Sequence, residues 1–131
     1  MNQNKMGPDN KCHCNSSVAG FINVKESANF KFDSDASWDQ AICIYKESNG
    51  KFSKKIEEKG TSGGRNLSDW QASEGNYMIT GWHKEEADNR NSQWVQSDVK
   101  ITLNENRDVT FGFEDGFDSN FTDITATCDL H

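Results

Sequence analysis

Apolar and polar residues alternate with a period of two along most of the chain. The alternation marks seven stretches, namely 18–24, 30–32, 38–45, 77–83, 94–103, 109–114 and 121–128. Because successive side chains of a β-strand point to opposite faces of a sheet, each stretch predicts a strand. In 38–45 both faces are apolar, which is typical of a central strand that is covered on both sides.

Turn signals separate these stretches. Asn49-Gly50 favours a tight type I′ hairpin, so 52–57 is expected to return antiparallel to 38–45 as a further strand. We predict a turn at 73–76 and an exposed loop at 84–93, which is wholly hydrophilic. About eight short strands without an amphipathic helix predict an all-β fold. We expect an antiparallel two-sheet β-sandwich, with an open β-barrel as the alternative.

The first 17 residues are polar and show no periodicity. We expect residues 1–17 to form a flexible N-terminal arm and residues 18–131 to form one β-sandwich domain with a single core. The arm lacks the apolar stretch of a secretory signal, which indicates either a cytoplasmic protein or a signal missing from this sequence; release or secretion stays open. No apolar run reaches the roughly 20 residues that span a bilayer.

The composition agrees with a sheet protein and limits its partners. Three leucines stand beside eight Phe and four Trp, and aromatic side chains suit a pleated, half-buried surface. The formal net charge of −7 and the pI of about 4.9 argue against binding nucleic acid, which needs a basic face. They argue equally against an anionic membrane surface.

The segment 111–123 concentrates oxygen donors among four phenylalanines. Its candidate metal ligands are Glu114, Asp115, Asp118, Asn120 and Asp123. Carboxylates crowded this closely repel one another unless water solvates them or a hard cation such as Ca²⁺ neutralises them. The sequence therefore allows two interpretations, a calcium site and a solvated Asp-Gly turn.

The same segment resembles a known signature. Residues 113–123 are similar to the Phe-Glu-Asp-x-x-Asp-x-Asp-Phe-Asn-Asp motif near the C-terminus of certain bacterial secreted and surface β-sandwich domains, where the acidic cluster holds calcium. The chain departs from the motif at Asn120 and Thr122, where the motif has Asp and Asn, so one charge is missing. The resemblance implies Ca²⁺ as a cofactor.

The two ends of the hydrophilic loop 84–93 form a candidate ligand site. Its residues are Trp82 and His83 before the loop, Gln93 at its end and Trp94 after it. Flat aromatic rings stack on the apolar faces of sugars, and amide or imidazole groups bind hydroxyls. The alternative is core packing, because tryptophan fills sandwich interiors well.

The cysteines leave three interpretations open. Cys43 lies in a strand-like run and is expected to be a buried hydrophobic residue. Cys12 and Cys14 lie near one end of the chain and Cys128 near the other. They can be free thiols, a disulfide that joins the two ends, or part of a metal site with His13.

The sequence contains no signature of catalysis. No Gly-x-Ser-x-Gly elbow, His-Glu-x-x-His helix or Cys/His nucleophile motif is present. We therefore predict a non-enzymatic, lectin-like binding module, assisted by calcium, that recognises a carbohydrate or a cell-surface glycoconjugate. The alternative is a toxin-like or self-assembling protein that acts through β edges and aromatic patches.

Overall fold

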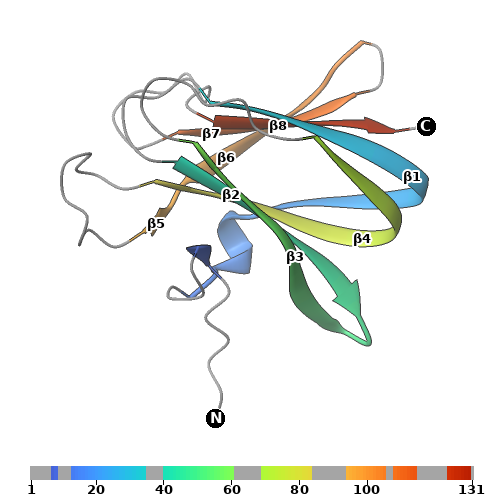
Figure 1. Ribbon diagram of the computed structural model, residues 1–131, viewed down its shortest axis with the longest axis horizontal. Coiled ribbons are helices and arrows are strands. Elements are labelled where there is room, and N and C mark those ends of the chain that lie inside the picture. Colours follow the sequence, from blue (N-terminus) through green and yellow to red (C-terminus); the bar gives the residue numbers. More distant parts are fainter. Residues whose placement is uncertain are drawn as a thin grey trace.

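The computed structural model describes residues 7–8, 13–34, 40–60, 69–83, 94–105, 108–114 and 124–130. Eight strands carry the fold (Figure 1): β1 (Gly20–Ser34), β2 (Gln40–Ser48), β3 (Lys51–Gly60), β4 (Trp70–His83), β5 (Val95–Gln96), β6 (Asp98–Leu103), β7 (Val109–Glu114) and β8 (Ile124–Leu130). A single turn of 3₁₀ helix, η2 (Ser16–Val18), precedes β1. No helix in the described ranges is long and apolar enough to cross a bilayer.

All strand pairs are antiparallel and belong to one continuous sheet. The strand order is β3-β2-β4-β1-β8-β7-β6, and β5 pairs with the end of β4. The sheet does not close, because β3 and β6 are its two outer strands. It folds over on itself into two layers, so the predicted antiparallel sandwich is confirmed, with both layers belonging to one sheet.

The fold-over is made by the two longest strands. The first part of β1 pairs with the second part of β4, and the second part of β1 pairs with both β4 and β8. The register shifts between Val24 and Ser27 of β1, opposite Gly75, whose φ is +153°. Such a β-bulge bends a strand, and β1 and β4 bend together there. The turn predicted at 73–76 is therefore wrong. These residues continue β4 and lie opposite the bulge of β1, where Lys25 and Glu26 oppose the single residue Glu74.

The main core lies between the two layers. Its large side chains are Phe30, Ile42, Ile44, Tyr77, Ile79, Phe111, Phe113 and Ile124, all buried. Two glycines let the layers approach closely. A Cβ on Gly81 would overlap the ring of Phe113, and one on Gly20 would lie 2.5 Å from Cδ2 of Phe111. The two phenylalanines of β7 thus pack directly onto the backbone of the facing layer.

A second cluster covers the outer face of the β2–β4 layer. It contains Ala41, Cys43, Tyr45, Met78, Trp82 and Trp94, with Cys14, Ala19 and Phe52 packed against it. Every residue from Gln40 to Tyr45 is buried, which confirms the prediction of a central strand covered on both sides. The segment just before β1, through Cys14 and Ala19, therefore covers this cluster.

Contacts hold this N-terminal segment to the sheet. The backbone N–H of Asn15 donates to Oε1 of Gln96 (2.7 Å), and Nε2 of Gln96 donates to the carbonyl of Asn15 (2.9 Å). Nζ of Lys54 donates to the carbonyl of Gly7 (2.9 Å). Residues 7–8 and 13–17 thus lie against the domain, although the sequence predicts a flexible arm there.

The structure confirms the predicted hairpin between β2 and β3 but divides the predicted strand 94–103 in two. Asn49 (φ +56°) and Gly50 (φ +80°) have the left-handed backbone of a type I′ turn, which confirms the predicted hairpin between β2 and β3. The stretch predicted as one strand, 94–103, is divided at Ser97 into β5 and β6. Strand β5 pairs with β4 in one layer, and β6 pairs with β7 in the other.

Candidate functional site

One end of the sandwich gathers the ends of the strands. Register places Gln40 opposite His83, Phe113 opposite Ile124, and Ser34 also opposite Ile124. The strand ends that flank 35–39, 84–93 and 115–123 therefore all lie at this edge, which we call the loop end (Figure 1). In antiparallel sandwiches, loops clustered at one end are the usual place for ligand contacts.

A buried polar group supports the loop end. The Nδ1 of His83 and the Oγ of Ser97 lie 2.7 Å apart in a hydrogen bond, and the backbone N–H of Ser97 donates to the carbonyl of Gly81 at 2.7 Å. Ser97 is 1% exposed, so this serine–histidine pair has the spacing of a nucleophile and base but no access to a substrate. Its role is to fix the point where the chain passes from β5 to β6.

Gln40, the residue opposite His83, is the unusual member of this region. Its side chain is fully buried, and neither the amide nitrogen nor the amide oxygen has a hydrogen-bond partner. A buried amide without partners destabilises a fold, and such groups in natural proteins call for an explanation in function. The sequence indicates only that Gln40 shares a face with apolar residues of its strand.

The structure brings three of the four predicted ligand-binding residues together. Trp82 pairs with Gln96 and His83 with Val95, so Trp82, His83 and Trp94 lie at one place, as expected for the base of the 84–93 loop. Gln93 lies outside the described residues. The register thus supports the predicted grouping around this loop.

The two tryptophan rings pack inward. Trp82 is 1% exposed, and its Nε1 donates to Oγ1 of Thr80 at 2.7 Å, inside the second cluster. Trp94 belongs to the same cluster and is 9% exposed. The two rings thus contribute to the packing of the second cluster at the loop end. A direct contact of Trp82, His83 and Trp94 with a ligand stays a prediction.

The acidic segment leaves the sheet at the same end. Glu114 is the last residue of β7, whereas Asp115, Asp118, Asn120 and Asp123 lie outside the described residues. The register adds one carboxylate that sequence reasoning missed, because Asp98 of β6 is directly opposite Glu114. Only the strand pairing could have revealed Asp98.

Within the described residues, no group of three or more His, Cys, Asp or Glu side chains is arranged to hold a metal ion. Cys14, Cys43 and Cys128 are free thiols. Cys43 is in the second cluster, as predicted for a buried hydrophobic residue, and Cys14 packs against that cluster, whereas Cys128 is in the main core. A disulfide between Cys14 and Cys128 is therefore not formed. Cys12 lies outside the described residues.

Burial sets the chemistry of these thiols. It raises the pKa of Cys43 to about 12, with the Glu57 carboxylate as a second cause. Burial also raises the pKa of Cys128 to about 12, with Asp129 and Asp108 adding to the effect. The thiolate is the nucleophilic form, so burial keeps both side chains protonated and weakly nucleophilic near neutral pH.

Comparison with known proteins supports the fold. No protein-family model and no curated protein matches the sequence. Among solved structures, the C-terminal domain of the BC2L-C lectin from Burkholderia cenocepacia is similar, with a TM-score of 0.61 and 18% identity over 86% of this chain and 96% of that chain.

Two further lectins give similar values. The lectin CV2L from Chromobacterium violaceum, solved in complex with α-methyl-fucoside, has a TM-score of 0.60 and 15% identity over 87% of this chain and 96% of its own. A high-affinity mannose-binding lectin from Ralstonia solanacearum has a TM-score of 0.59 and 16% identity over 89% and 98%. The chain thus has the fold of these bacterial lectins over almost their whole length.

Proposed function

We propose that this protein is a non-enzymatic, lectin-like module that binds a carbohydrate at the loop end with the help of Ca²⁺. The observation that carries the proposal is the likeness to three lectins, one of them a fucoside complex and one a mannose binder, over nearly the full length of each chain. The fold alone does not determine function, so the residues at the loop end must supply the rest of the argument.

The acidic segment supplies the calcium part of the proposal. Segment 115–123 joins two adjacent strands whose ends are side by side, so its carboxylate and amide oxygens are confined to a short connection. Calcium takes six to eight oxygen ligands, and Glu114, Asp115, Asp118, Asn120 and Asp123 are of the right chemical type. The carboxylate of Asp98, opposite Glu114, adds negative charge at the same edge.

These residues fit a binding role better than a catalytic one. A bound Ca²⁺ would supply a cation to which vicinal hydroxyls of a sugar can bind. The buried pair of His83 and Ser97 links the strand ends on either side of 84–93, and Trp82 and Trp94 pack in the second cluster. Loops positioned in this way on a rigid sheet can recognise a ligand without any residue that moves a proton.

The test measures sugar binding with and without calcium. Isothermal titration with α-methyl-fucoside and with methyl α-mannoside should show binding in millimolar Ca²⁺ and none in EDTA. Asp118→Asn should abolish the calcium-dependent binding, whereas Glu74→Gln, an exposed carboxylate of β4, should leave it unchanged. Equal heats in calcium and in EDTA would contradict the calcium part. Binding of neither sugar, nor of any glycan on an array, would contradict the carbohydrate part.

A second candidate function is supported by the open edges of the sheet. Strand β6 is an outer strand, and its Ile101 and Leu103 are exposed, the latter at 73%. Exposed strand edges with apolar side chains can pair with another chain, which fits a self-assembling protein. Mass measurement by light scattering distinguishes the two functions. A lectin-like module keeps its mass on meeting target cells or membranes, and an assembling protein gains mass.

A further inference from the structure

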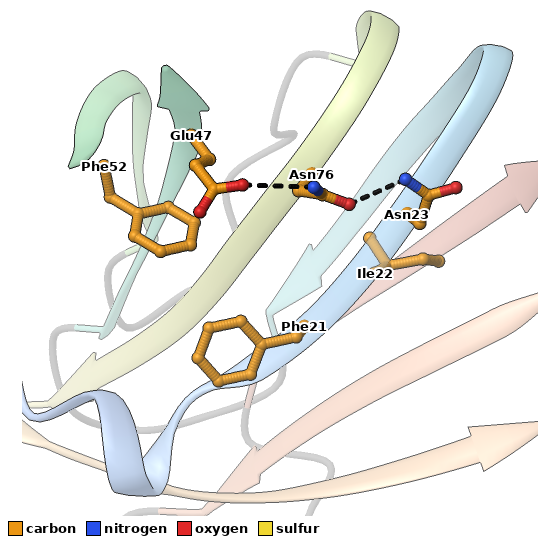
Figure 2. A pocket seen from close by; sticks show the side chains of 6 residues that line it. All are labelled: Phe21, Ile22, Asn23, Glu47, Phe52 and Asn76. Atoms are coloured by element: carbon orange, nitrogen blue, oxygen red, sulfur yellow. Dashed lines mark hydrogen bonds between the residues drawn. The ribbon is translucent and has the colours of Figure 1, made fainter. Parts of the chain in front are cut away.

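A groove on the outer face of the sheet lies far from the loop end. It has a volume of about 380 Å³ and is lined by Phe21, Ile22, Asn23, Glu47, Phe52 and Asn76 (Figure 2). Glu47 is seven residues along β2 from Gln40, which is about 23 Å at the rise of a strand. The groove is therefore separate from the site proposed above.

A row of polar side chains crosses three neighbouring strands along this groove. Nδ2 of Asn23 donates to Oδ1 of Asn76 at 2.6 Å, and Nδ2 of Asn76 donates to Oε1 of Glu47 at 3.1 Å (Figure 2). Asn23 and Asn76 are directly opposite each other in the β1–β4 register. Each side chain in the row is thus held in place by its neighbour, and the row is ordered before any ligand arrives.

The row still has hydrogen-bonding capacity to offer. A carboxylate accepts through two oxygens, and the Glu47 bond to Asn76 uses only one of them. Asn23 uses one amide hydrogen toward Asn76, which leaves its second amide hydrogen and its carbonyl oxygen. The groove thus presents fixed acceptors and donors side by side, the combination that a hydroxyl group needs.

Two phenylalanines form the apolar side of the groove. The rings of Phe21 and Phe52 meet edge to face, with centroids 6.1 Å apart, and Phe21 is 51% exposed. Phe52 also packs against the second cluster, which anchors it to the body of the protein. Phe21 thus presents an anchored, accessible apolar ring directly beside the ordered polar row.

We propose that this groove is a second, calcium-independent binding site for the pyranose ring of a neutral saccharide. The apolar face of a sugar ring would lie on Phe21 and the edge of Phe52, and its hydroxyls would bind Glu47 and the two asparagines. The carboxylate of Glu47 disfavours phosphorylated and sulfated ligands, because it would repel their charge. The site rests on observations that are independent of the calcium proposal.

The groove is open and shallow, so binding should be weak. Its volume lies near the lower end of the range for small-molecule sites. A ligand that buries only one face keeps much of its surface in water, which predicts a dissociation constant in the millimolar range for a single sugar ring. Glycans that reach both this groove and the loop end would bind more tightly through two contacts.

The test is an NMR titration of the ¹⁵N-labelled full chain in EDTA, which excludes any calcium-dependent site. Methyl α-mannoside, α-methyl-fucoside and methyl β-galactoside are the probes. At least one should shift the backbone amides of Phe21, Asn23, Phe52 and Asn76 in a saturable way. Phe21→Ser and Glu47→Gln should each weaken binding at least tenfold.

Leu103→Ser is the matched control, because it removes an exposed apolar side chain from the other layer. It should not change the titration. No shift with any probe well above millimolar concentration would overturn the proposal. Shifts that depend on protein concentration alone, with a doubled mass, would also overturn it, because a second copy of the chain would then occupy the groove. Since EDTA is present throughout, failure here does not bear on the calcium-dependent function.

Discussion

Replacing Gln40 with methionine should stabilise the protein. The folded state buries both polar atoms of the Gln40 amide completely and gives neither a hydrogen-bond partner. In the unfolded chain both atoms bond to water, so folding loses those bonds. A buried amide group without a partner costs about 1–3 kcal/mol. Methionine has a similar length and volume and no group that needs a partner, so Gln40→Met should raise the free energy of unfolding by about 1–3 kcal/mol.

The assay is urea unfolding followed by circular dichroism at neutral pH. The midpoint should rise while the slope stays the same, because the surface exposed on unfolding hardly changes. For a chain of 131 residues, each kcal/mol corresponds to about 4 °C in the melting temperature. Gln71→Met, on the exposed side of β4, is the matched control and should change stability by less than about 0.5 kcal/mol.

The opposite result would refute this reasoning. If Gln40→Met lowers stability by more than about 1 kcal/mol, the amide makes hydrogen bonds in the folded protein that outweigh its desolvation. If Gln40→Met is stabilising and also weakens sugar binding, the amide is kept for function at the expense of stability, as is common near binding sites.

Three further changes test other parts of the structure. Gly81→Ala should destabilise the protein by about 1–3 kcal/mol in urea unfolding, because the added Cβ would overlap Phe113. Adding Phe113→Leu to the same chain should recover part of the loss, and equal stability of Gly81→Ala and the parent would disprove the close contact. Stability should fall as the pH rises from the ordinary thiol pKa toward 12, because the unfolded chain loses the protons of Cys43 and Cys128 first, and a flat profile across this range would contradict their burial. Calcium at 100 times its dissociation constant should raise the free energy of unfolding by about 2.7 kcal/mol in the parent protein and not in Asp118→Asn.

Local patterns in the sequence predict much of the fold. Period-two alternation identifies the strands, and Asn49-Gly50 identifies the hairpin, because both depend on neighbouring residues only. Residues 73–76 predict a turn but continue β4 opposite the bulge of β1, because a glycine with polar neighbours gives the same local signal in both cases. The sequence also does not predict that the strand 94–103 is divided at Ser97, because the alternation of apolar residues continues on both sides of Ser97.

The candidate sites divide in the same way. The grouping of Trp82, His83 and Trp94 follows from a loop whose two ends must meet, so the sequence predicts it. The burial of the Trp82 and Trp94 rings cannot be predicted from the sequence, because the segment that covers the second cluster, residues 14–19, has no apolar periodicity. Asp98 opposite Glu114, and the row from Asn23 to Glu47, depend on pairing between strands that are distant in sequence.

The shared bend of β1 and β4 has a consequence for how the molecule opens. Each of these strands runs through both layers, so their backbone hydrogen bonds belong to both layers at once. One layer cannot detach while the other stays folded, because that would break the same two strands. Amide hydrogens of β1, β4 and β8 should therefore exchange together, with protection close to the global free energy of unfolding, whereas β3 and β6 at the outer edges should exchange earlier.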